Sequence, residues 1–207
     1  SHLRFSDNPI KSAYLINKAD FVACHQFQFM NKVDILGIAK PGATFLLNAP
    51  YDANEVWNHL TYEVQKQIID KKLKFYTINA VEVARETGMG QRINTIMQSC
   101  FFAISNILPR EQAIAEIKNA IKKTYSKKGD AIVQKNFAAV DASLAHMHEV
   151  VIPAEPTSTL HTALPVPADA PEFIQKVTGE IIAGRCEQLP VSAFADVVDG
   201  TWPTGTT

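Results

Sequence analysis

The stretch ATFLLNAPYDANEVWNHLTYEVQKQIIDKKLKFYTIN, residues 43–79, decides the fold class of this chain. It opens with ATFLLN (43–48) and closes with KFYTIN (74–79), two short apolar runs that are rich in aromatic or branched residues. Runs of this kind, bounded by Asn, Asp, Gly and Pro, are typical of buried strands. The stretch therefore predicts two neighbouring strands with a long connection between them.

The connection itself has helical periodicity. Apolar residues recur every four positions from Val56 to Ile68, and Asp52 with Glu55 has the spacing of a capping box. We therefore expect a helical crossover over residues 52–72.

The same alternation continues on both sides of this unit. SAYLI (12–16) and DFVAC (20–24) indicate further buried strands, whereas a helix is expected from Gly90 and another over residues 109–125. Strands that alternate with helices are typical of a parallel sheet covered on both faces. The prediction is an α/β fold, a three-layer sandwich with a mostly parallel sheet between helices.

The C-terminal quarter has a different composition. Residues 151–171 contain many prolines and no periodicity, which favours an arm or linker. A short helix is expected over residues 171–184, followed by loop-like sequence. We therefore divide the chain into an α/β domain at 1–150 and an arm, short helix and linker at 151–207.

Composition restricts the function classes. The 207 residues carry a formal net charge of −1 with a pI near 6.6, so no global field would attract nucleic acid. No apolar run is long enough to cross a bilayer, and no signal peptide is evident. We expect a cytoplasmic protein that binds neither nucleic acid nor membrane.

Residues that could carry catalysis or hold a metal are not grouped in recognisable motifs. The three cysteines, Cys24, Cys100 and Cys186, lie far apart in sequence, and the six histidines have no catalytic or metal-ligating spacing. Cys100 falls on the apolar face of the predicted helix, so we assign it to the core. The sequence indicates neither a catalytic residue nor a metal ligand.

GMGQRIN, residues 88–94, is the most distinctive candidate for binding. A helix start can hold an anion, glycine lets a ligand approach the backbone, and Arg92 and Asn94 add a phosphate donor and an amide beside Gly90. Asn48, which ends a predicted strand, should reach the same carboxyl edge of the sheet. The alternative interpretation is that Gly88 ends the preceding element and Gly90 is a turn.

Many ordered segments resemble the central, gamma-type domain of pyruvate:ferredoxin (flavodoxin) oxidoreductase, and the match runs nearly end to end. They are SHLRF (1–5), ADFVACH (19–25), FLLNAPY (45–51), GMGQRINTIMQ (88–98), FFAISNILP (101–109), AIKKTYSKKG (120–129), VQKNFAAVDA (133–142) and DGTWPTGTT (199–207). Within this family, the resemblance implies the single-chain bacterial enzyme that feeds electrons to flavodoxin or ferredoxin, as in nitrogen-fixing organisms.

The resemblance implies an enzyme that decarboxylates pyruvate on thiamine diphosphate with Mg, passes electrons through 4Fe-4S clusters to ferredoxin or flavodoxin, and forms acetyl-coenzyme A. It places those cofactors in other domains of the same polypeptide, within a homodimer, and implies that the gamma-type domain binds coenzyme A and covers the active site. Gly90, Arg92, Asn94 and Asn48 would then contact coenzyme A, with Ser1 and Arg4 as further candidates. For Arg4 an interdomain salt bridge is the alternative, and the domain as a whole could instead be a purely structural docking module.

Two departures from the family pattern bear on these expectations. Relatives carry a glycine-rich segment of the form GSDGTVGANK before SHLRF, so we expect the first strand and its loop to be truncated here. Relatives also have Pro where Thr61 stands, and Thr61 should leave the crossover helix more continuous.

Overall fold

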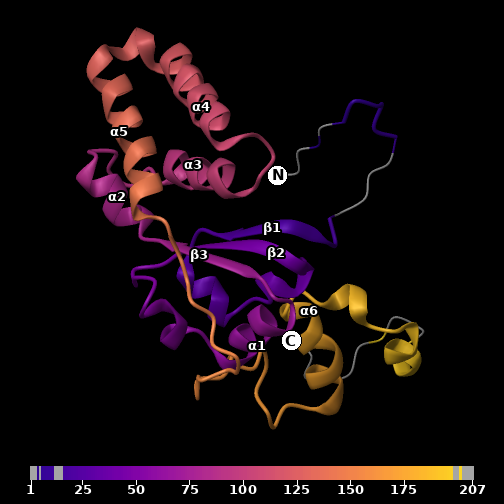
Figure 1. Cartoon of the computed structure of the whole chain (residues 1–207). Coiled ribbons are helices and arrows are strands. Elements are labelled where there is room, and N and C mark those ends of the chain that lie inside the picture. The colour runs from indigo at the N-terminus through magenta and orange to yellow at the C-terminus, as the bar shows by residue number, and fades with distance from the viewer. Residues whose placement is uncertain (1–3, 5, 12–15, 198–200, 202–207) are drawn as a thin grey trace.

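The computed structural model describes residues 4, 6–11, 16–197 and 201. Within them, a four-stranded sheet of order β1-β2-β3-β4 lies between two helical layers (Figure 1). The strands are β1 (Ala19–Cys24), β2 (Ala39–Asn48), β3 (Lys74–Ile78) and β4 (His148–Glu149). The helices are α1 (Tyr62–Asp70), α2 (Ala80–Glu86), α3 (Asn94–Ile104), α4 (Arg110–Tyr125), α5 (Asp130–His146) and α6 (Gly179–Ile182).

The three longer strands are parallel, which confirms the predicted fold class. β1 pairs with β2 and β2 with β3 in parallel, and the short β4 adds an antiparallel edge to β3. The sequence did not indicate β4, because a pairing of two residues leaves no periodic signal. The expected strand over residues 12–16 falls largely outside the described residues.

Side chains on β2 alternate between two separate cores. Phe45 and Leu47 pack with the connections that follow β1 and β2, whereas Leu46 packs with α2, α3 and α5. Phe45 stacks on Phe75 of β3 with ring centroids 5.1 Å apart. All three β2 side chains are fully buried, so β2 is the central strand of the sandwich.

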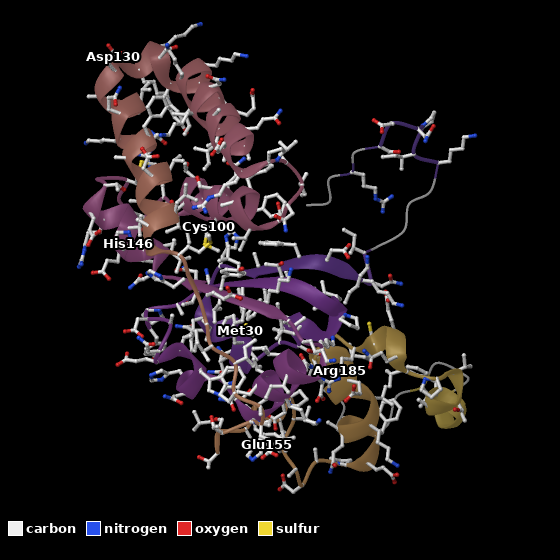
Figure 2. The ribbon with its side chains drawn as sticks, viewed as in Figure 1. Met30, Cys100, Asp130, His146, Glu155 and Arg185 are labelled. Atoms are coloured by element: carbon white, nitrogen blue, oxygen red, sulfur yellow. The ribbon has the colours of Figure 1, made fainter. Side chains whose placement is uncertain are left out.

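The labelled side chains in Figure 2 show the same two layers. Cys100 lies between α3 and the sheet, and Met30 lies on the opposite side of the sheet. Cys100 is fully buried among apolar neighbours, as predicted for a core residue, and burial raises the pKa of its thiol to about 12.

The crossover between β2 and β3 is broken, contrary to the expectation of one helix through Thr61. A single turn at Val56–His59 precedes α1, and Thr61 has extended backbone at the N-terminal end of α1. Asp52 does accept hydrogen bonds from the backbone of Asn54 and Glu55, but it begins this separate turn. The helix breaks because its first donor, the Tyr62 N–H, bonds the Leu160 carbonyl in the arm at 2.7 Å.

The arm is held on α1 by a buried carboxamide. The side chain of Gln65 is fully buried; its oxygen accepts hydrogen bonds from the N–H groups of Thr157 and Ser158, and its nitrogen donates to the Trp57 carbonyl. The Trp57 indole also donates to the Thr157 hydroxyl at 3.0 Å. The proline-rich arm therefore docks on the α/β domain at this point, through groups that would otherwise be unsatisfied.

A second arm contact is made by a carboxylate of α1. The Glu63 carboxylate accepts hydrogen bonds from the His161 imidazole at 2.7 Å and from the Thr162 N–H at 2.9 Å. Partial burial raises the pKa of Glu63, but the hydrogen bonds from His161 and Thr162 outweigh it and lower that pKa from 4.5 to about 2.

The remaining helices also follow the sequence pattern, with shifted boundaries. α4 and α5 form a hairpin that projects away from the sheet (Figure 1). The hairpin has a small core of its own, formed by Ile117, Ile121, Val133 and Val140. At the C-terminal end, one helical run from Ile174 through Ile182 stops before Gly184, which has a φ of 74°.

Replacing Gln65 with Ala should lower the free energy of unfolding by about 2 to 4 kcal/mol, because two N–H groups and a carbonyl lose their partner in a buried site. Urea unfolding followed by circular dichroism measures this. Gln98→Ala, at an exposed glutamine of α3, is the matched control and should change stability by less than about 0.5 kcal/mol. Equal effects of the two substitutions would contradict the assignment of Gln65.

Glu63→Gln should destabilise the protein most at neutral pH. Since the pKa of Glu63 is about 2 when folded and 4.5 in the reference state, the carboxylate contributes fully above about pH 5 and progressively less as the pH falls toward 2. The difference between the thermal midpoints of wild type and variant should therefore narrow between about pH 6 and pH 3. A difference that stays constant over this range would contradict the stabilising role of the Glu63 carboxylate.

Candidate functional site

A cavity of about 830 Å³ lies at the carboxyl ends of the three parallel strands. Residues 25–28 after β1 and 48–51 after β2 contribute to it, together with residues between 79 and 85 after β3. Gln91 and Ile93, which precede α3, complete the lining. Parallel strands bring these loops to one edge, where ligands commonly bind in open α/β sheets.

Asn48, a predicted contact residue, holds this edge together. Its side-chain nitrogen donates to the His25 carbonyl at 2.9 Å, and its oxygen accepts from the Ala80 N–H at 2.9 Å. It is 7% exposed and lines the cavity. Asn48 therefore joins the ends of β1 and β2 to the start of α2, so it shapes the cavity.

Asn79 and the first turn of α2 form a polar rim. The Asn79 oxygen accepts from the Glu82 N–H at 3.1 Å and caps α2. Glu82 also pairs with Arg85 at 2.9 Å, and both residues line the cavity. The two opposite charges in this rim thus neutralise one another.

An aromatic group closes the side of the cavity formed by the first two loops. Tyr51 stacks on His59 with ring centroids 3.5 Å apart, and Phe27 contacts Tyr51 edge-on at 5.3 Å. Phe27 and Tyr51 line the cavity. This wall offers aromatic surface to a ligand.

The GMGQRIN segment reaches the cavity through other residues than those predicted. Gly88 ends α2, with the Met89 N–H bonded to the Ala84 carbonyl at 2.7 Å, which agrees with the alternative interpretation of this glycine. Gly90 has a φ of 65° and forms a turn, so α3 begins at Asn94 and not at Gly90. Gln91 and Ile93 line the cavity, whereas Gly90 and Arg92 of the same loop, and Asn94 at the start of α3, lie outside its lining.

Two further candidates lie elsewhere. Ser1 falls outside the described residues. Arg4 is half-buried, has an interacting partner, and lines neither this cavity nor a smaller one beneath the sheet. Arg4 is therefore not part of the cavity lining, and the role of Ser1 stays a prediction.

Neither a metal site nor a membrane span is found within the described ranges. They contain no group of three His, Cys, Asp or Glu residues that could hold a metal, and none of their helices is long and apolar enough to cross a membrane. Cys24 and Cys100 belong to cores on opposite faces of the sheet, and Cys186 is exposed. All three cysteines are free thiols.

Sequence reasoning missed the glutamines of the cavity, Gln26, Gln28 and Gln91, and the rim arginine Arg85. Gln26 and Gln28 directly follow a predicted strand, as Asn48 does, so the strand-end argument could have found them. Gln91 lies between Gly90 and Arg92, and only the turn at Gly90 decides which neighbour faces the cavity.

Comparison with known proteins gives two family matches. Residues 1–146 match the family described as pyruvate ferredoxin/flavodoxin oxidoreductase, and residues 159–207 match a family described as a domain of unknown function.

Individual relatives carry names that correspond to the family that matches residues 1–146. The chain is 54% identical over 207 residues to pyruvate-flavodoxin oxidoreductase of Rhodospirillum rubrum and 55% identical over 210 residues to that of Trichormus variabilis. It is 47% identical over 207 residues to pyruvate:ferredoxin oxidoreductase of Moorella thermoacetica. These matches cover 100% of the chain and 17% to 18% of each relative, so the chain spans less than a fifth of their length.

A solved structure shares the fold. Pyruvate oxidoreductase subunit PORC from Thermotoga maritima superposes with a TM-score of 0.50 at 16% identity, over 64% of this chain and 66% of that one. At this identity the likeness supports the α/β architecture alone.

Asn48→Ala should lower the free energy of unfolding by about 1 to 3 kcal/mol, because the Ala80 N–H and the His25 carbonyl lose their partners. Chemical denaturation measures the loss. Asn58→Ala, at an exposed asparagine, is the control and should be nearly neutral. A neutral result at Asn48 would mean that its two hydrogen bonds do not brace the edge.

Proposed function

Because the chain belongs to the pyruvate ferredoxin/flavodoxin oxidoreductase family, we propose that it is one domain of such an enzyme, where it binds coenzyme A and closes over the active site. The enzyme would oxidatively decarboxylate pyruvate, transfer the acetyl group to coenzyme A and pass the electrons to flavodoxin or ferredoxin. Relatives are named for each of these acceptors.

The cavity at the carboxyl edge is the observation that carries the proposal. Its volume of about 830 Å³ falls in the range of sites that take sizeable small molecules. It also combines polar side chains with aromatic and aliphatic ones, as a ligand with both characters requires. Coenzyme A is such a ligand.

We propose that the loop before α3 holds the anionic part of coenzyme A. Arg92 is exposed between two residues that line the cavity, and Asn94 begins α3, whose first N–H groups have no capping side chain. A side chain at Gly90 would meet no heavy atom within 4 Å, so the backbone there is open to a ligand. Ser1 and Arg4 remain candidates for a second contact, and Asn48 acts by shaping the cavity.

The cysteines of this chain do not fit a 4Fe-4S cluster. A 4Fe-4S cluster requires four cysteines, whereas this sequence has three, two of which lie in opposite cores. We therefore propose that thiamine diphosphate, Mg and the clusters belong to other domains of a cytoplasmic, homodimeric parent. The unit at 1–150 would bind the coenzyme, and the segment at 151–207 would link it to the next domain.

A purely structural docking module is the second candidate. Ile107 and Leu108, 62% and 37% exposed in the loop between α3 and α4, and the lysines at the hairpin tip favour contacts with other domains. In that case Arg92 would support assembly without contacting a coenzyme.

Arg92→Ala should weaken binding of coenzyme A to the chain about tenfold, the value of one charge-assisted hydrogen bond. Isothermal titration calorimetry at low and moderate salt measures this, and binding should weaken as salt rises. Arg110→Ala, at an exposed arginine that starts α4, is the control and should bind normally.

The same substitution in the parent enzyme separates the two candidates. Loss of acetyl transfer with pyruvate decarboxylation retained would support coenzyme binding. Unaltered coenzyme affinity with reduced thermal stability or assembly would favour the docking module instead.

A further inference from the structure

The carboxyl-edge cavity has a lining whose charges cancel. Among the residues that line it, Glu82 and Arg85 carry the formal charges, and they pair with each other at 2.9 Å. A pyrophosphate inside the cavity would have to take Arg85 from Glu82 and leave that carboxylate facing an anion. The lining therefore disfavours the charged part of a coenzyme.

Three carboxamides supply the polar character instead. Gln26 and Gln28 follow β1, Gln91 precedes α3, and all three are exposed in the lining. Within the part of the chain that the structure describes, none of the three side chains has a hydrogen-bonding partner, in contrast to Asn48 and Asn79, whose amides are engaged. Each glutamine can both donate and accept, which matches a ligand that carries secondary amides.

Apolar side chains complete the lining. Phe27 and Tyr51 form the aromatic wall on one side, whereas Val81 comes from the first turn of α2 and Ile93 from the loop before α3. Val81 is 57% exposed, so its side chain is accessible to a ligand in the cavity. The cavity thus suits a chain in which amides alternate with saturated carbon.

We infer that this cavity binds the pantetheine arm of coenzyme A, a neutral diamide with a branched aliphatic end, and that the nucleotide part lies outside the lining. The inference rests on the proposed function and specifies which part of the ligand occupies the cavity. The amides would meet Gln26, Gln28 and Gln91, the dimethyl group would contact Val81 or Ile93, and the phosphates would lie toward the loop at Arg92.

The experiment is a calorimetric titration of the 207-residue chain with three ligands: coenzyme A, pantetheine, and adenosine 3′,5′-bisphosphate. We expect coenzyme A and pantetheine to bind with affinities within about tenfold of each other, and pantetheine binding to be insensitive to salt because the arm is neutral. Adenosine 3′,5′-bisphosphate should bind more weakly than pantetheine and lose affinity as salt rises.

Gln91→Met removes the carboxamide at nearly constant side-chain size and should weaken pantetheine binding about threefold to tenfold. Gln112→Met, at an exposed glutamine of α4 in the hairpin, is the matched control and should leave binding unchanged. The thermal midpoint of each variant shows whether a loss of affinity comes from unfolding.

The outcomes separate this inference from the proposed function. Binding of coenzyme A and the bisphosphate without binding of pantetheine would overturn the inference and leave the proposed function standing. Binding of pantetheine that Gln91→Met does not change would also overturn it, because the arm would then lie elsewhere. No binding of any of the three ligands would overturn both.

Discussion

Parallel pairing around β2 is the constraint on which the rest of this structure depends. Since β2 is buried on both faces and paired at both edges, its two connections must cross over the sheet and return to the same end. The crossovers lie on one face, with Trp57, Leu60 and Val64 in their core, and α2, α3 and α5 cover the other. The carboxyl ends of three strands consequently meet at one edge, which creates the cavity.

The arm shows how a segment without periodicity acquires a defined place. The Leu160 carbonyl of the arm accepts a hydrogen bond from the first N–H of α1, and the Gln65 side chain accepts hydrogen bonds from two N–H groups of the arm. The same contact therefore satisfies backbone polar groups on both sides. The arm therefore packs as part of the helical layer that contains α1, although its composition is typical of a linker. This docking also explains the break at Thr61, since the arm takes the hydrogen bond that a continuous helix would have used.

The cavity lining and the loop before α3 differ in charge. The lining is neutral and rich in carboxamides, whereas Arg92 stands exposed beside it, so a ligand with a neutral arm and an anionic end fits this arrangement best. Family membership makes coenzyme A the leading candidate. The described cysteine, histidine and acidic residues form no group that could hold a metal ion.

Sequence alone determined the layer order, the parallel strands, the burial of Cys100 and the position of Asn48 at the carboxyl edge, because these follow from hydrophobic periodicity and from the direction of parallel strands. It did not determine the break at Thr61, the short β4 or the docking of the arm, because each depends on hydrogen bonds between residues far apart in the chain, such as Gln65 with Thr157. Only the tertiary structure decided that Gln91 and not Arg92 lines the cavity. The reason is geometric: the left-handed backbone of Gly90 sets the direction of the residues after it, and no sequence pattern specifies which of two neighbouring side chains that turn directs inward.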